Sequence, residues 1–244
     1  MSLEKADGII IKRTSLNDND VILTIFSKER GKIQAIVKGG KKTKSPFLGS
    51  TQLFCYTQFV YYTGKNFDYI NQTQLISSFY SIRNELERLS IATYMLDIIL
   101  NSFETEQKEE RIFYLLLYSL NTLNKCVEMP KLLLLTFQMK IAGLMGYAPE
   151  FIRCSKCHDK IEKTYYSREL GGFICENCLA SYPYADKIKD EQIKLLEKLL
   201  YIPMQEITKV QIRQQLNFLV DIMNKYITYH IDKKLYSYEF LEII

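Results

Sequence analysis

The sequence predicts an α+β protein with several domains. A small β-barrel comes first, followed by a mostly α-helical domain into which a four-cysteine module is inserted. Residues 8–76 carry short β-type runs separated by turn signals. From residue 78 onward, apolar residues recur at three- and four-residue steps, which is the period of an amphipathic helix. Two Cys-x-x-Cys pairs then interrupt the helical pattern.

The first 76 residues contain five runs with the composition of β-strands. They are rich in β-branched or aromatic residues and cover 8–13, 21–26, 33–38, 53–62 and 67–74. Turn signals such as Gly39-Gly40 and Gly64-Lys65-Asn66 separate them, and no helical period intervenes. Five short strands in this length predict a small barrel of the OB-fold type, an architecture that binds oligonucleotides through one face and its adjoining loops.

Helical periodicity continues to the C-terminus on both sides of the cysteines. We expect helices over 79–99, 111–126, 130–144, 188–200, 211–229 and 233–244. Pro130 stands at a helix start, where proline is tolerated. The last helices should pack on the earlier ones, because neither group alone hides its apolar face.

These patterns predict four segments along the chain. They are an OB-fold domain over 1–77, a first helical part over 78–150, a zinc-finger module over 151–183 and a second helical part over 184–244. The N-terminus lacks an apolar signal-peptide core, and no apolar run is long enough for a membrane span, so we expect a cytoplasmic protein with no membrane partner.

The four cysteines of the module have the spacing of a metal site. Cys154 and Cys157 form one pair, and Cys175 and Cys178 form the second pair after an intervening loop. Each pair places two thiolates on one tight turn, and Gly171-Gly172 suits a turn that brings the two pairs together. Four thiolates complete a tetrahedral shell and leave no position for water, which predicts one structural Zn²⁺.

Two other interpretations of this segment are open. The cysteines would be free or disulfide-bonded thiols if no metal bound, although disulfides are rare in a reducing cytosol. His158 adjoins Cys157 and offers a substitute ligand, but with four cysteines present we expect it to be solvated or to support a ligand.

Positive charge is concentrated in the N-terminal segment. Residues 1–76 hold eleven Lys or Arg against six Asp or Glu, whereas residues 184–244 hold nine of each. Four lysines fall within seven residues between two predicted strands: Lys38, Lys41, Lys42 and Lys44. Such a loop suggests a polyanion, and we expect it to neutralise phosphates without recognising bases, with Lys12 and Arg13 extending the surface. The alternative is a solvated loop that keeps the protein soluble.

Aromatic residues cluster in the last two predicted strands. They are Phe54, Tyr56, Phe59, Tyr61, Tyr62, Phe67 and Tyr69. Alternate positions must fill a barrel interior, so we expect most to be core and one or two to be exposed, where they would stack on single-stranded bases.

Catalytic motifs are missing from the sequence. The lysine segment lacks the spacing of a phosphate-binding P-loop, and Pro46 follows where the helix should begin. There are two histidines, His158 and His230, and no nucleophile elbow or HExxH motif. We therefore expect the protein not to be an enzyme.

An ordered set of short segments carries a family resemblance. The segments are Gly8–Lys12, Asn19–Ile22, Phe26–Lys32, Lys38–Ser45, Leu86–Tyr94, Leu144–Pro149 and Lys234–Ser237. With the cysteine module between helices, this set resembles the bacterial RecO family of DNA repair proteins over nearly the whole chain.

The resemblance implies a function in recombinational repair. RecO-like proteins bind single- and double-stranded DNA, anneal complementary strands, and with RecR help to load RecA onto DNA covered by single-strand binding protein (SSB). They catalyse no known covalent chemistry, and they act in the cytoplasm at the nucleoid. In this chain, the lysines of 38–44 match the family's basic loop. A dock for the acidic SSB tail needs an apolar groove rimmed by cations, and Lys131 and Lys140 border an apolar helix of that kind.

The extent of duplex binding and two alternative functions are open. The helical segments are neutral or acidic, which speaks against broad duplex binding. An RNA-binding or transcription-associated zinc factor would use the same barrel but would prefer RNA in competition. A structural adaptor would place the lysine loop on an acidic protein surface and would not bind DNA at low salt.

Overall fold

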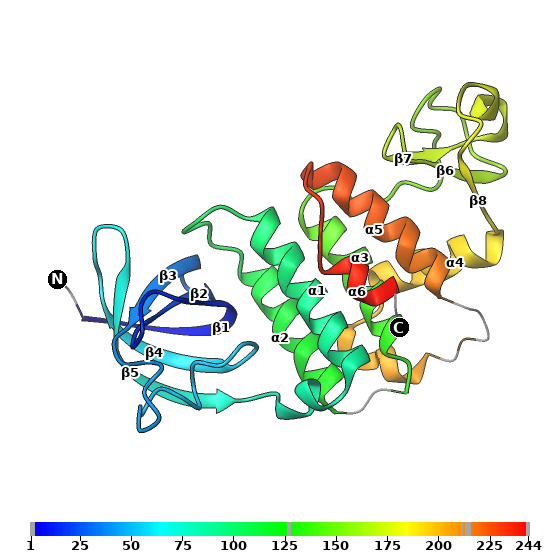
Figure 1. The fold of residues 1–244 in the computed structure, drawn as a ribbon. Coiled ribbons are helices and arrows are strands. Elements are labelled where there is room, and N and C mark those ends of the chain that lie inside the picture. The colour runs from blue at the N-terminus through cyan, green and yellow to red at the C-terminus, as the bar shows by residue number, and fades with distance from the viewer. Residues whose placement is uncertain (1–2, 126–127, 211, 213–215, 243–244) are drawn as a thin grey trace. The chain divides into compact units, whose positions relative to one another are not determined.

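The computed structural model describes residues 3–125, 128–210, 212 and 216–242, which form two compact units (Figure 1). In the described part, residues 3–125 make up the first unit and residues 128–242 the second. The first unit holds the strands at the N-terminus and the two helices that follow them. The division therefore falls between the second and third α-helices, while the four segments expected from the sequence remain predictions.

Five strands close into a barrel in the first unit. They are β1 (Leu3–Ser15), β2 (Val21–Ser27), β3 (Gly31–Val37), β4 (Tyr56–Tyr62) and β5 (Asp68–Ser77). Their order is β1-β2-β3-β5-β4, with β1 also pairing with β4, and every pair is antiparallel except β3 with β5. This confirms the predicted five-stranded OB-fold. The fourth strand starts at Tyr56 and not at residue 53, since Phe54 has a left-handed backbone (φ 70°).

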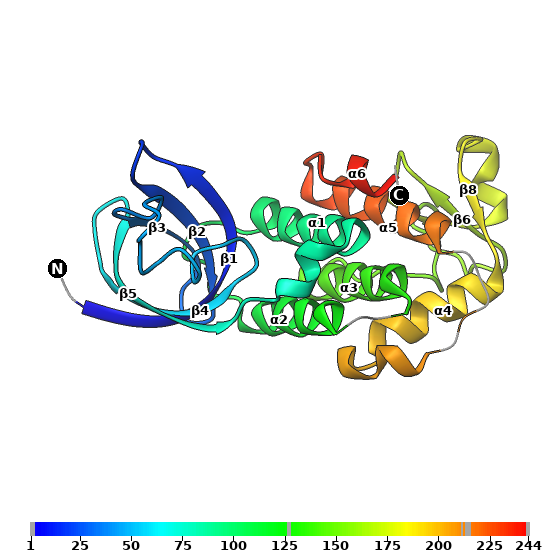
Figure 2. The same cartoon turned by 60° about the horizontal axis from the view of Figure 1, so that its bottom comes forward.

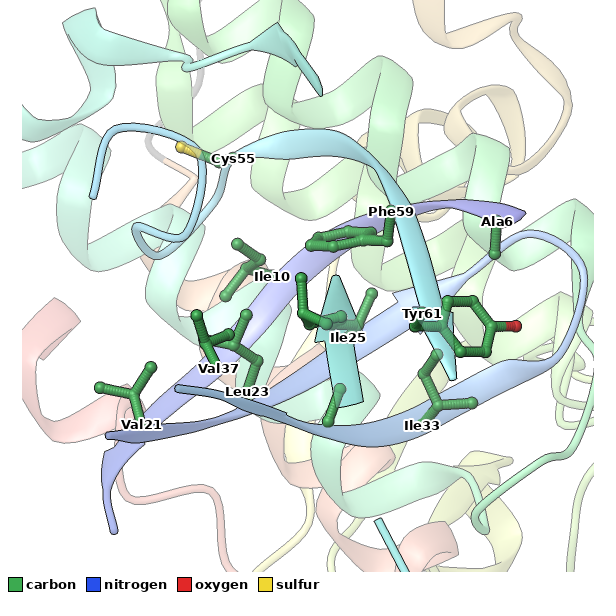
Figure 3. Close-up of a cluster of buried hydrophobic side chains, with 12 residues drawn as sticks. Ala6, Ile10, Val21, Leu23, Ile25, Ile33, Val37, Cys55, Phe59 and Tyr61 are labelled. Atoms are coloured by element: carbon green, nitrogen blue, oxygen red, sulfur yellow. The ribbon is translucent and has the colours of Figure 1, made fainter. Parts of the chain in front are cut away.

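Side chains that alternate along the strands fill the barrel (Figure 3). Strand β3 shows this most simply, because Ile33, Ala35 and Val37 are buried while Gln34 between them is exposed. Phe59 and Tyr61 of β4 are buried in the same cluster. Cys55 also lies in this cluster. Apolar burial of this kind is the main stabilising term for such a small barrel.

Two helices pack on the barrel within the first unit. After the short 3-10 helix η1 (Tyr80–Asn84) come α1 (Leu86–Ser102) and α2 (Glu110–Asn124). The ring of Phe26 in β2 lies 6.1 Å from that of Phe103 and 6.3 Å from that of Phe113. The single helix predicted over 79–99 is thus wrong at its start, because Glu85 is extended (φ −128°) and separates η1 from α1.

Arg30 links the barrel to the loop between α1 and α2. Its guanidinium donates to Asp68 Oδ2 at 2.8 Å, to Tyr61 Oη at 3.3 Å, and to Glu106. Asp68 is almost fully buried, so this ion pair compensates a charge that would be costly alone. Burial opposes the charged form of Arg30, but the bonds to Tyr61 and Glu106 and the charge of Asp68 outweigh it and raise the pKa of Arg30.

The second unit contains a small sheet and the remaining helices. Its elements are α3 (Pro130–Leu144), β6 (Thr164–Ser167), β7 (Gly172–Ile174), η2 (Glu176–Ser181), β8 (Asp186–Ile188), α4 (Asp190–Tyr201), η3 (Met204–Lys209), α5 (Asn217–Ile231) and α6 (Tyr238–Glu242). The strands form a sheet in the order β7-β6-β8, and β8 leads almost directly into α4 (Figure 2). The four-cysteine module thus lies between helices, as predicted.

The later helices pack on α3, as expected from the sequence. Gln138 of α3 donates to the Val220 carbonyl at 3.1 Å, and Lys140 donates to the Leu200 carbonyl at 2.9 Å. The predicted helix ends at 126, 211 and 244 lie outside the described residues. Within the described residues, no helix is both long enough and apolar enough to cross a membrane.

Glycine is required at position 31 but not at position 49. Gly31 has a φ of +69°, and a Cβ there would overlap the backbone carbonyl of Gln107, whereas a Cβ on Gly49 would meet nothing within 4 Å. Gly31→Ala should therefore lower the free energy of unfolding by about 2 kcal/mol or more, and Gly49→Ala by less than about 0.5 kcal/mol. Urea denaturation measures both. Equal stabilities of the two variants would contradict the close approach of Gln107 to β3.

Candidate metal centre and nucleic-acid interface

The four predicted cysteines converge on one point in the second unit. The sulfur atoms of Cys154, Cys157, Cys175 and Cys178 all lie within 4.8 Å of one another. Two of the Sγ–Sγ distances are 3.8 Å, from Cys154 to Cys178, and 3.7 Å, from Cys157 to Cys175. These distances are far longer than a disulfide bond of about 2.05 Å. Sulfur ligands about 2.3 Å from one zinc ion stand about 3.8 Å apart at tetrahedral corners, so the cluster fits a zinc ion.

Backbone hydrogen bonds shape the two cysteine turns. The N–H of Cys154 donates to the Asp159 carbonyl at 2.9 Å, and the N–H of Ser155 donates to the Phe173 carbonyl at 2.8 Å. The second of these bonds joins the first cysteine turn to strand β7, which leads into Cys175. Gly171 has a φ of +55°, and a Cβ there would overlap the ring of Tyr229. This glycine therefore permits the turn between β6 and β7 and the close packing of that turn on α5, in agreement with the predicted glycine turn.

The surroundings of Cys154 and Cys157 shift the pKa values of their thiols in opposite directions. Burial raises the pKa of Cys154, but backbone N–H groups, including that of Cys175, outweigh it and lower this pKa to about 6. For Cys157, the Asp159 N–H lowers the pKa, while burial and the neighbouring thiols raise it more, to about 12. Four thiolates this close together repel one another, so a divalent cation is the natural way to hold all four deprotonated.

His158 is not part of the cluster. Its side chain is exposed and its backbone has a φ of 64°, which places its N–H on the Cys154 carbonyl at 2.9 Å. The ligand atoms that converge in the described residues are the four sulfurs. The position of His158 agrees with the solvated histidine expected from the sequence, whereas His230 lies in an aromatic cluster and makes a 3.0 Å hydrogen bond to the Gly171 carbonyl.

The lysine loop, residues 38–44, lies between β3 and β4 and is fastened to the loop between β1 and β2. Asp20 accepts a hydrogen bond from the Gly39 N–H at 2.7 Å, and the Lys41 N–H donates to the Asn19 carbonyl at 2.9 Å. The Gly39 amide and the Asn17 side chain hold the pKa of Asp20 below its ordinary value. Asp20 is therefore ionised at neutral pH, and its contribution is lost only as pH falls through this lowered pKa.

Most of the predicted phosphate ligands are accessible. Lys38, Lys42 and Lys44 are exposed and Lys41 is half-buried, with its ammonium on the Asn17 carbonyl. The ammonium of Lys38 also lies 5.9 Å from the centroid of the Tyr69 ring. The loop thus presents three exposed cations, one of them near an aromatic ring, and a half-buried cation that helps to hold the loop in place.

The two flanking cations differ in their surroundings. Lys12 is exposed on β1, next to the bulge at Ile10 and Lys12. Arg13 is half-buried and donates to the Gly40 carbonyl at 3.2 Å. Arg13 therefore serves the lysine loop as a backbone anchor, a role that the sequence did not indicate. The tethers from Asn17, Asn19 and Asp20 were also missed, although the cluster of Asn and Asp is a turn signal.

Of the seven aromatic residues singled out in the last two strands, Tyr62 is the exposed one, at 39%. Phe54, Phe59 and Tyr61 are buried, and the other three are half-buried. One exposed ring confirms the expectation of one or two, whereas the expectation that most of the seven would be core is wrong, because three are buried.

On the proposed rim of an SSB dock, Lys140 is occupied by its bond to the Leu200 carbonyl, and burial lowers its pKa. The assignment of Lys131 and Lys140 to that dock stays a prediction.

Comparison with known proteins covers the whole chain. The family model described as Recombination protein O N terminal matches residues 1–79, and the one described as Recombination protein O C terminal matches residues 83–239. The DNA repair protein RecO of Acetivibrio thermocellus is 33% identical over 100% of this chain and 98% of its own length. That of Alkaliphilus metalliredigens is 32% identical over 95% of each chain. With matches at both ends and over the full length, this chain belongs to the RecO family.

Proposed function

We propose that this chain is a DNA-binding mediator of recombinational repair that holds DNA on the barrel and its lysine loop. The family supports a role in DNA repair and recombination, and its members are mediators that are not known as enzymes. The observation that carries the proposal is the tethered lysine loop on a closed OB-fold barrel. Lysines contact phosphates without recognising bases, which suits a protein that must act at any sequence.

The tethers explain how the loop would bind DNA efficiently. A loop that is already fastened at Gly39, Gly40 and Lys41 loses less conformational freedom on binding than a free one. Its exposed ammonium groups replace the counterions of the phosphates, and screening of this kind lets two complementary strands approach each other. Strand annealing needs no catalytic residue, and it would follow if the protein holds two strands together while their charge is screened. Tyr62 and the half-buried Tyr69 supply ring faces on which unpaired bases can stack.

The finer steps of the pathway belong to the same proposal. With RecR, the chain would help to load RecA onto SSB-coated single strands, and it would contact the acidic C-terminal tail of SSB. Family membership supports these steps. Its site of action would be DNA in the cytoplasmic nucleoid.

We further propose that the four cysteines bind one structural Zn²⁺. A zinc ion held by four thiolates has no free position for water, so it would stabilise the module and would not take part in chemistry. The 3.7 and 3.8 Å sulfur separations support this proposal. The cysteines that would hold the zinc ion lie on two turns. The hydrogen bond from the Ser155 N–H to the Phe173 carbonyl connects the first turn to strand β7, which leads into the second turn.

Removal of one ligand tests the metal. Cys175→Ser should lower the zinc content from about one ion per chain to well below one and should destabilise the second unit, because metal binding energy is folding energy at such sites. Elemental analysis of the purified protein measures the zinc. Cys55→Ser, at a buried cysteine of the barrel, is the control and should keep its zinc. A stoichiometric ion in Cys175→Ser would contradict the ligand assignment.

A salt series tests the DNA interface. The variant with Lys38, Lys41, Lys42 and Lys44 all changed to Ala should bind a labelled single strand more weakly. The slope of log K against log salt should be shallower by up to about three, at about 0.7 per phosphate contact. Fluorescence anisotropy measures both quantities. A variant with Lys5, Lys65, Lys108 and Lys125 changed to Ala removes the same charge from exposed positions of the first unit and is the control.

The outcomes separate the rival functions. Equal slopes for the two quadruple variants would move DNA away from the lysine loop. Stronger binding of an RNA competitor would favour an RNA-binding factor. A wild type that binds no DNA at low salt would favour the structural adaptor.

A further inference from the structure

A groove with four lysines lies where the cysteine module meets helix α4 in the second unit. It has a volume of about 540 Å³, and its lining includes Lys163, Lys187, Lys189 and Lys194. Lys163 directly precedes β6, Lys187 lies in β8, and Lys194 lies in α4. The groove is thus built from the start of β6 in the cysteine module and from β8 and α4, which follow the module.

Strand pairing places these cations near one another. In the antiparallel pair of β6 and β8, Thr164 faces Ile188 and Tyr165 faces Lys187. Lys163 and Lys189 are the residues next to the Thr164–Ile188 pair, each just outside its strand. Side chains two residues apart on an extended backbone share a face, so Lys187 and Lys189 lie on the same side, while Ile188 between them is buried. Ammonium groups gathered in this way favour the binding of an anion.

The groove has few compensating charges. Lys163 forms an ion pair with Glu176 at 2.8 Å, and the lining holds two carboxylates, Asp190 and Glu191, in the first turn of α4. Lys187, Lys189 and Lys194 are exposed, and none of them forms an ion pair with a residue that the structure describes. With Lys163 paired to Glu176, three ammonium groups stand against two carboxylates in the lining, which leaves an excess of positive charge.

We propose that this groove binds the phosphate backbone of a DNA strand, as a second contact surface separate from the lysine loop of the barrel. The inference rests on the proposed function for its choice of polyanion. An acidic peptide that ends in an apolar side chain is the less suitable occupant, because the one apolar residue of the lining, Ile188, is 2% exposed and leaves no pocket for such an anchor. Phosphates need only the accessible cations that the groove offers.

The sequence did not indicate this surface, because its lysines lie in segments whose net charge is low. Residues 151–183 carry a net charge of +1 and residues 184–244 a net charge of zero, so neither segment is basic on average. The fold gathers one lysine from the first segment with three from the second. A second site on the second unit gives the chain two places at which to hold DNA, which is what an annealing protein requires when it holds two strands.

Three lysines of the groove can be removed together. In the full chain carrying the four lysine-loop changes, Lys187→Ala, Lys189→Ala and Lys194→Ala should weaken the remaining single-strand binding and lower the salt slope by a further two or so, at about 0.7 per contact. The cap of α4 survives, because it uses the backbone N–H of Lys189, which donates to Gln192 at 2.9 Å. Lys156, Lys160 and Lys209, also exposed in this unit, changed together to Ala, are the control.

A variant that should bind DNA more tightly gives a second test, because misfolding would weaken binding and could not produce this result. Glu176→Gln removes the carboxylate that holds Lys163, so it should tighten single-strand binding severalfold at low salt and steepen the slope by up to about 0.7. Glu169→Gln makes the same charge change at an exposed position of the β6–β7 turn and should have a smaller effect. Zinc content of both variants shows whether the cysteine module is intact.

The results distinguish this inference from the function on which it rests. If the wild type binds DNA but the groove triple variant matches its control, and Glu176→Gln matches Glu169→Gln, the groove is not a DNA surface while the lysine-loop proposal stands. If the wild type binds no DNA at low salt, both proposals fail. Loss in the triple variant together with gain in Glu176→Gln supports the groove.

Discussion

Closure of the barrel between β3 and β5 is the constraint on which the first unit depends. The other strand pairs of the barrel run over seven residue pairs each, whereas β3 and β5 pair at Ala35 with Asp68 and at Ile36 with Tyr69. Arg30 reinforces this short seam through Asp68, and it also reaches the loop between α1 and α2 through Glu106. Without closure, β3 would expose a free edge.

The lysine loop shows how a polar network can prepare a binding surface. The Asp20 carboxylate accepts from the Gly39 N–H, and the Arg13 guanidinium donates to the Gly40 carbonyl. Among the described residues, no lysine of the loop forms an ion pair with a carboxylate. The loop is held while its ammonium groups stay available. A mobile lysine-rich loop would carry the same net charge but would lose more entropy on binding phosphates.

The elements that could be predicted from sequence are those set by local pattern. Cys154 and Cys157 lie on one turn whatever the rest of the fold does, and the alternation in β3 marks a strand by itself. Contacts between distant residues have no such signature. Arg13 and Gly40 are 27 positions apart, and nothing in either segment indicates that one anchors the other. The break at Glu85 was missed for a similar reason, since the helical period runs through it and the packing of η1 decides the backbone.

The groove of the second unit is a functional example of the same contrast between local sequence pattern and contacts between distant residues. The lysines at 38–44 could be identified from the sequence because they are neighbours along the chain. Charge along the chain does not indicate that Lys163 and Lys189 line one groove, because the pairing of β6 with β8 is what brings their segments together. The same pairing belongs to the module that the four cysteines organise, and Glu176, the partner of Lys163, stands between Cys175 and Cys178. A metal at the cysteines would therefore do more than stabilise a fold, because it would keep these lysines in register. The proposed zinc site and the proposed DNA surface would thus depend on the same small sheet.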